Sequence, residues 1–79
     1  MRIISQDKKV DIPYELAVLG ISDDCHIWSS VGTCQDMIGT YKSLDDARAV
    51  LWTIAANFKA GKHYFEMPPE DEDLSYAKM

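Results

Sequence analysis

The sequence lacks the features that mark several large classes of protein. No apolar stretch approaches the roughly 20 residues that a membrane-spanning helix needs, and no basic segment followed by an apolar one opens the chain as in a secretory signal. Basic residues are outnumbered, with 8 Lys and Arg against 13 Asp and Glu, so no basic excess favours binding to nucleic acid. We therefore expect a cytoplasmic protein that binds neither a membrane nor, directly, a nucleic acid.

Residues that carry catalysis or hold metals are also scarce. A metal ion needs three or four ligands, and the candidates beyond scattered carboxylates are Cys25, His26, Cys34 and His63. Cys25 and His26 are adjacent in an expected strand and point to opposite faces, so they cannot share an ion. The four glycines form no phosphate-binding pattern, and Ser29 lacks the strand–turn–helix setting of a hydrolase nucleophile. We expect no metal, no cofactor, no catalytic residue and two free thiols, hence a protein that is not an enzyme.

What the chain does contain is one small domain with an acidic end. Its 79 residues are 47% apolar and 27% charged, the balance of a folded globular domain. Pro68 and Pro69 precede the four carboxylates of residues 70–73, and before them residues 1–67 are nearly neutral, with 9 acidic against 7 basic side chains. We predict a single domain over residues 1–67 and an acidic, flexible tail over 68–79 that folding does not require. A second interpretation makes that tail an arm that enters a basic groove on a partner.

The strongest local pattern predicts a helix over about residues 44–60. Ser43 suits the N-cap, Asp46 completes a start like a capping box, and Gly61 suits the residue after the last turn. Apolar residues recur at helical spacing and define the side that faces the core: Ala47, Val50, Leu51, Ile54 and Phe58.

The remainder of the chain is typical of short strands. Extended, β-prone segments separated by polar or Gly-containing turns occupy residues 2–6, 10–12, 14–21, 25–31, 34–41 and 63–67. The sequence therefore predicts an α+β fold, in which the helix packs on one face of an antiparallel sheet of four or five strands.

Two tryptophans suggest surfaces for a partner. Trp52 falls outside the core side of the helix, on a side shared with Ala49 and Ala56, where either another segment covers it or it forms an interface. Trp28 alternates away from Ile27, so it is either the lid of a second small core or an anchor for a partner. We expect a homo-oligomer, most simply a homodimer, through the Ala49–Trp52–Ala56 strip or through the apolar strand at residues 16–21.

A second interpretation assigns some of these residues to a phosphate-bearing ligand. Arg48 lies one turn before Trp52 and, with Lys42, could contact phosphates. Trp28, Trp52 or Tyr41 could stack on a base. This pattern is compatible with an oligomer that holds a nucleotide between its subunits.

Several segments resemble a known family. The opening Met1–Asp7 (MRIISQD) and Asp11–Glu15 (DIPYE), the phrase Gly39–Ser43 before an acidic helix start, and Tyr64–Pro68 before the acidic run resemble small proteins encoded in phages and prophages of Firmicutes. The resemblance implies a setting in the bacterial cytoplasm during phage carriage. It favours a non-enzymatic accessory protein that binds and modulates or inhibits a host factor, such as an antiphage-defence component. The alternative is an oligomer that sequesters a nucleotide signal of such a defence.

Overall fold

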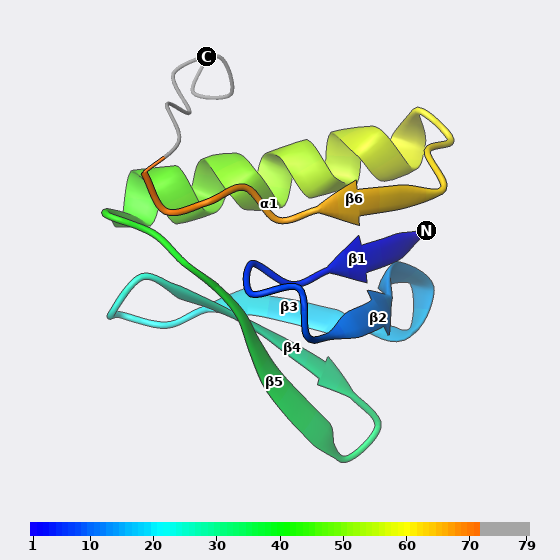
Figure 1. Cartoon of the computed structure of the whole chain (residues 1–79), viewed down its shortest axis with the longest axis horizontal. Helices are drawn as coiled ribbons and strands as arrows, with labels where there is room; N and C mark the ends of the chain where they lie inside the picture. Colours follow the sequence, from blue (N-terminus) through cyan, green and yellow to red (C-terminus); the bar gives the residue numbers. More distant parts are fainter. Residues whose placement is uncertain (72–79) are drawn as a thin grey trace.

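The computed structural model describes residues 1–71, which form one helix and six short strands (Figure 1). In chain order these are β1 (Arg2–Ile4), β2 (Asp11–Pro13), a 3-10 turn (Tyr14–Leu16), β3 (Val18–Ile21), β4 (His26–Val31), β5 (Cys34–Thr40), α1 (Leu44–Lys59) and β6 (Tyr64–Glu66). The strands build two sheets, with the orders β2-β1-β6 and β3-β4-β5. Within residues 1–71 there is no helix with the length and apolarity to cross a membrane.

The α+β class is confirmed, but the expected single sheet of four or five strands is wrong. The strands divide because Pro13 ends β2 and the next three residues coil into the 3-10 turn, which leaves only Val18–Ile21 of the expected strand at residues 14–21. The purely antiparallel pairing is wrong as well. β6 pairs with β1 in parallel, whereas the other three strand pairs are antiparallel. The chain passes through α1 before it forms β6. This long crossover connection allows β6 to run beside β1 in the same direction.

The helix agrees with its prediction to within one residue. The Ser43 hydroxyl accepts a hydrogen bond from the Asp46 amide at 3.1 Å, which satisfies one of the free N–H groups of the first turn. At the other end Gly61 takes a φ of 81°, the left-handed conformation that ends many helices. The buried side consists of Ala47, Ala49, Val50 and Ile54, while Leu51 is half-buried and Phe58 is exposed.

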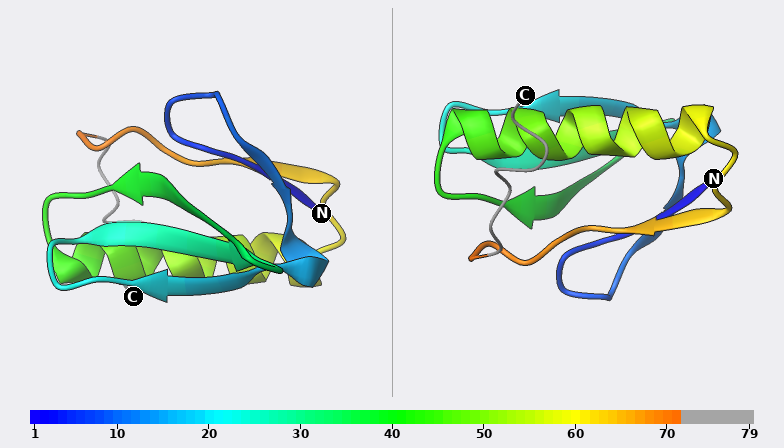
Figure 2. Two further views of the ribbon diagram at one scale, coloured as in Figure 1. Left: turned by 90° about the horizontal axis from the view of Figure 1, so that it is seen from below. Right: turned by 90° about the horizontal axis from the view of Figure 1, so that it is seen from above.

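α1 lies across one face of β3-β4-β5, and the opposite face of this sheet is turned toward the viewer in Figure 2, left. The core lies between the helix and both sheets. It is built from large side chains with almost no exposed area. Those that the strands and the helix contribute are Ile3, Ile12, Ile27, Ile38, Val50 and Ile54. Because both sheets contribute, a small chain buries its helix on more than one side.

The segment after β6 remains attached to the body. Met67 is buried, and the Pro68 carbonyl accepts hydrogen bonds from Tyr41 Oη at 2.8 Å and Gln6 Nε2 at 3.1 Å. Pro68, which the sequence assigns to the tail, is therefore bonded to the domain. Glu70 is exposed, and the acidic run continues beyond residue 71, outside the described residues.

Candidate interaction surfaces

The face of β3-β4-β5 that points away from α1 carries an uncharged row of side chains. The pairing places Gly20 opposite Trp28 and Trp28 opposite Met37, so these residues share one face. Val18 lies on the same face, because it is two residues from Gly20. Val18 is 72% exposed, Trp28 41% and Met37 42%. No Asp, Glu, Lys or Arg occupies the strand positions of this face, which are Val18, Gly20, His26, Trp28, Ser30, Gln35, Met37 and Thr40.

Trp28 is held in place by its neighbours. Its indole Nε1 donates to the Ser22 hydroxyl at 3.3 Å, and its ring lies 6.3 Å from that of His26 between centroids. Side chains that are already ordered lose less conformational entropy when a partner binds. Trp28 therefore has the properties of a preformed anchor.

The turn beside Trp28 brings together a serine, an aspartate and a histidine. Ser22 Oγ donates to Asp24 Oδ1, and Asp24 Oδ2 lies 3.3 Å from His26 Nδ1. The bond from the Ser22 hydroxyl lowers the pKa of Asp24, and the nearby His26 adds to that shift. Because the serine proton goes to the carboxylate and not to the imidazole, the nucleophile-to-base contact of a catalytic triad is missing. The arrangement instead orders the turn next to Trp28.

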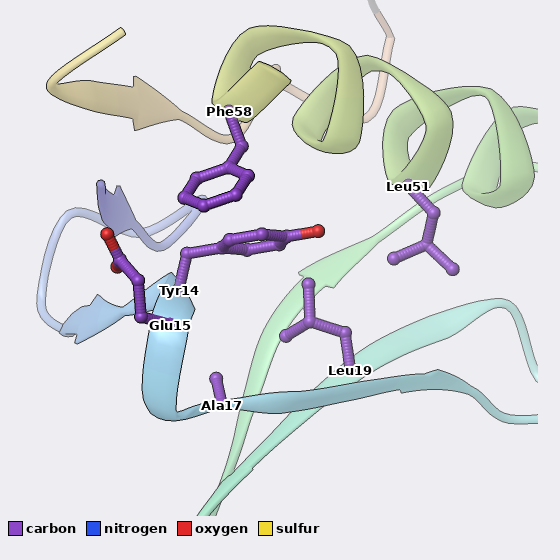
Figure 3. Close-up of a pocket in the computed structure, with 6 residues that line it drawn as sticks. All are labelled: Tyr14, Glu15, Ala17, Leu19, Leu51 and Phe58. Atoms are coloured by element: carbon purple, nitrogen blue, oxygen red, sulfur yellow. The ribbon is translucent and has the colours of Figure 1, made fainter. Parts of the chain in front are cut away.

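A second surface is an apolar groove between α1 and β3 (Figure 3). Tyr14 and Phe58 meet there with their ring centroids 4.9 Å apart, and Leu19 and Leu51 point toward one another from the sheet and the helix. Glu15 lies at the mouth of this end and forms an ion pair with the N-terminal ammonium of Met1. That ammonium lowers the pKa of Glu15.

The groove continues along the helix toward its N-terminal half. Leu51 is shared by both parts, and the second part adds Ile21, Arg48, Trp52 and Ala55. Arg48 also lies 3.8 Å from Asp45, one turn earlier on the helix. The two parts of the groove thus contact β3 through Leu19 and Ile21. The Glu15 carboxylate, paired with the Met1 ammonium, lines the first part, and the Arg48 guanidinium, close to Asp45, lines the second.

The residues predicted as an interface are only partly together on the surface. Trp52 is 73% exposed and Ala56 is exposed, whereas Ala49 is 3% exposed and belongs to the core. The expected Ala49–Trp52–Ala56 strip is interrupted because the core reaches further around the helix than one sheet could cover. Trp28 is exposed, as an anchor requires.

The residues predicted to hold a nucleotide are only partly brought together, because Arg48 and Trp52 line the same groove and Tyr41 does not. Tyr41 is 2% exposed and its hydroxyl donates to Pro68, so its ring has no face for a base. Lys42 and Arg48 are exposed, and Arg48 lines the helix groove.

Sequence reasoning overlooked Val18 and Met37 as members of the outer face. The alternation of side chains along each strand could have found Val18, but Met37 depends on a shift in register at Ile27 and Trp28 that no local pattern indicates. Cys25, which is half-buried, and Cys34, which is exposed, lie as free thiols at opposite ends of the β4–β5 hairpin. Residues 1–71 contain no group of three or more His, Cys, Asp or Glu side chains that could hold a metal ion.

Comparisons of the chain with protein-family models, with curated proteins and with solved structures give no match.

Proposed function

We propose that this chain is a small non-enzymatic protein that binds a host protein through the outer face of β3-β4-β5. The observation that supports this most is the exposed row of Val18, Trp28 and Met37 on a face without a charged side chain. Because 27% of the residues in the chain are charged, a sheet face without Asp, Glu, Lys or Arg differs from the average composition of the chain. The cores of protein–protein interfaces are poor in charge and rich in tryptophan and methionine.

The shape of this face favours a macromolecule over a small ligand. The apolar groove described above lies on the helix side of β3, whereas Trp28 is exposed on the opposite face of the sheet. Small ligands are bound in concave sites that cover most of their surface, whereas an exposed sheet face suits another protein. Trp28 would supply the central anchor and the serine and glutamine side chains a polar surround.

The resemblance to phage and prophage proteins of Firmicutes supports a partner in the bacterial host cell. In that setting, binding would modulate or inhibit the host protein, and an antiphage-defence component is the target we favour. The alternative is a protein that sequesters a nucleotide signal. One of its three expected stacking residues, Tyr41, is buried, whereas Trp28 and Trp52 are exposed. We rank it second.

Affinity purification from a bacterial host lysate tests the proposal when matched variants are compared. We expect the unmodified chain to retain a host protein that Trp28→Ser does not retain. Tyr64→Ser is the control, because Tyr64 is an exposed aromatic residue on the other sheet, 61% exposed. If Trp28→Ser and Tyr64→Ser retain the same proteins as the unmodified chain, the outer face is not the binding surface.

A further inference from the structure

We propose, building on the partner site described above, that this site is sensitive to pH: when His26 is protonated, the outer face of β3-β4-β5 binds its partner more weakly. His26 and Trp28 are two residues apart on β4, so their side chains lie on the same face of the sheet. Their ring centroids are 6.3 Å apart. Histidine ordinarily changes its charge between about pH 5 and about pH 8, so this change of charge occurs beside the expected anchor.

His26 is the one side chain at the strand positions of this face that can gain a charge in that range. The other positions are Val18, Gly20, Trp28, Ser30, Gln35, Met37 and Thr40. The His26 side chain is 29% exposed, so water reaches it in the free chain, and a partner seated on Trp28 would cover it. The face is therefore uncharged only while His26 is neutral.

Asp24 is the charged group that faces His26 directly. Its Oδ2 atom lies 3.3 Å from His26 Nδ1. On the opposite side, β5 places Thr40, which carries no charge, across from His26. Asp23 and Lys42 are exposed near the same end of the sheet, where water and salt screen their charges. A proton on His26 therefore acts mainly on Asp24 and on the surface that the partner would cover.

Hydrogen bonds connect Asp24 to the Trp28 indole. Ser22 Oγ donates its proton to Asp24 Oδ1 and accepts the Trp28 Nε1–H at 3.3 Å. A hydroxyl has one proton and two lone pairs, so the ionised carboxylate orients the Ser22 oxygen to accept from the indole. The Ser22 bond lowers the pKa of Asp24 and nearby His26 adds to that shift, so Asp24 remains ionised while His26 titrates. The charge of His26 thus acts on the indole N–H through Asp24 and Ser22.

A protonated His26 opposes binding because the partner would have to cover a charge. Burying a charge costs free energy unless a neighbouring group of opposite charge and hydrogen bonds compensate it. Asp24 compensates it only in part, because its side chain is 68% exposed and would lose contacts with water as well. When a complex excludes one proton that the free chain binds, the dissociation constant rises by up to about tenfold per pH unit. We expect about a tenfold rise from about pH 7.5 to about pH 5.5.

Nuclear magnetic resonance of the chain alone measures the coupling between His26 and Trp28. We expect the Trp28 indole N–H resonance to shift between about pH 5 and about pH 8, whereas that of Trp52, on α1, should shift much less. His26→Gln should remove the Trp28 shift, because glutamine does not change its charge. His63→Gln is the matched control, since His63 is the other histidine of the chain, and should leave the shift unchanged.

Isothermal titration with the retained host protein at about pH 7.5 and about pH 5.5 measures the effect on binding. The ratio of the dissociation constants of the natural chain and His26→Gln cancels any titration of the partner's own groups. We expect this ratio to rise about tenfold at the lower pH, and His63→Gln to behave like the natural chain. His26→Lys is charged at both pH values and should bind about tenfold more weakly than His26→Gln at the higher pH.

Two results would overturn the inference and leave the proposed partner site intact. A Trp28 resonance that does not shift with pH, or that shifts equally in the natural chain and in His26→Gln, would show that His26 does not act on the anchor. A ratio that stays constant between the two pH values, while Trp28→Ser loses the partner, would show that binding does not sense His26. If Trp28→Ser retains the partner, the proposed site itself is wrong, and its regulation is excluded with it.

Discussion

The side-chain amide of Gln6 pairs with the backbone of Thr40 in the way that a neighbouring strand would. The Thr40 amide donates to Gln6 Oε1 at 3.1 Å, and Gln6 Nε2 donates to the Thr40 carbonyl at 3.0 Å. The backbone N–H of Gln6 also donates to the Ile38 carbonyl at 2.8 Å. One residue that follows β1 thus joins the two sheets at the end of β5.

We expect Gln6→Ala to destabilise the fold by about 2 kcal/mol, because it leaves partly buried backbone groups of Thr40 and Pro68 without these bonds. Urea unfolding measures the change. Gln35→Ala is the control, since Gln35 is exposed on β5 and should change stability by less than about 0.5 kcal/mol. Equal stability of the two variants would show that Gln6 does not join the sheets.

Truncation should separate the domain from its acidic end. A chain ending at Asp71 keeps every bond described for Pro68 and should melt like the full chain. A chain ending at Met67 loses the Pro68 carbonyl, which accepts from Tyr41 Oη and is one of two acceptors of Gln6 Nε2, and should lose about 1–3 kcal/mol. Thermal unfolding of both chains decides this. A chain ending at Met67 that melts like the one ending at Asp71 would show that the Pro68 bonds contribute nothing.

Cys25 holds a conformation that favours glycine. Its φ is 67°, and its amide donates to the Ser22 carbonyl at 3.0 Å to close the turn between β3 and β4. We expect Cys25→Gly to raise the free energy of unfolding by up to about 1 kcal/mol, because glycine adopts this conformation without a Cβ penalty. Cys34→Gly, the control in a strand, should lower it. A loss of stability in Cys25→Gly would contradict the argument from backbone conformation.

Asp7 should make stability depend on pH in the acid range. The Ser5 hydroxyl donates to its carboxylate at 2.6 Å and the Lys9 amide at 3.0 Å, and these bonds lower its pKa below the ordinary 3.8. A lowered pKa means that the folded state binds the proton more weakly than the unfolded chain does. The stabilisation is therefore complete above about pH 4 and is lost as the pH falls through the folded-state pKa.

Unfolding of the natural chain and of Asp7→Asn from neutral pH down to about pH 2 tests this expectation. The natural chain should be the more stable of the two at neutral pH, and the difference should shrink below about pH 4. A difference that stays constant across this range would contradict the role of the ionised Asp7.

The helix could be predicted because its signals are local. The ends of the helix are indicated by Ser43, Asp46 and Gly61 together with a few neighbouring residues. Each of the three has the predicted role or position. The division into two sheets depends on contacts between distant residues, such as Gln6 with Thr40, 34 positions apart, which no periodicity indicates.

The same contrast applies to the candidate surface. Strand alternation separated Trp28 from Ile27, and the helical pattern placed Trp52 outside the core side, but both patterns left open whether another segment covers them. The structure shows both side chains exposed. Ala49 was placed on the wrong side because the pattern assumed one sheet beneath the helix. In the structure Ala49 shares a buried cluster with Ile3 and Met67, so the second sheet extends the core around α1.

The affinity of the retained host protein for three purified chains tests the central claim most directly. Isothermal titration should give Trp28→Ala a dissociation constant at least about 30-fold above that of the natural chain, the loss of roughly 2 kcal/mol expected of a central interface tryptophan. Tyr64→Ala should bind within about twofold of the natural chain. Equal dissociation constants for all three chains would contradict the assignment of the outer face of β3-β4-β5 as the binding surface.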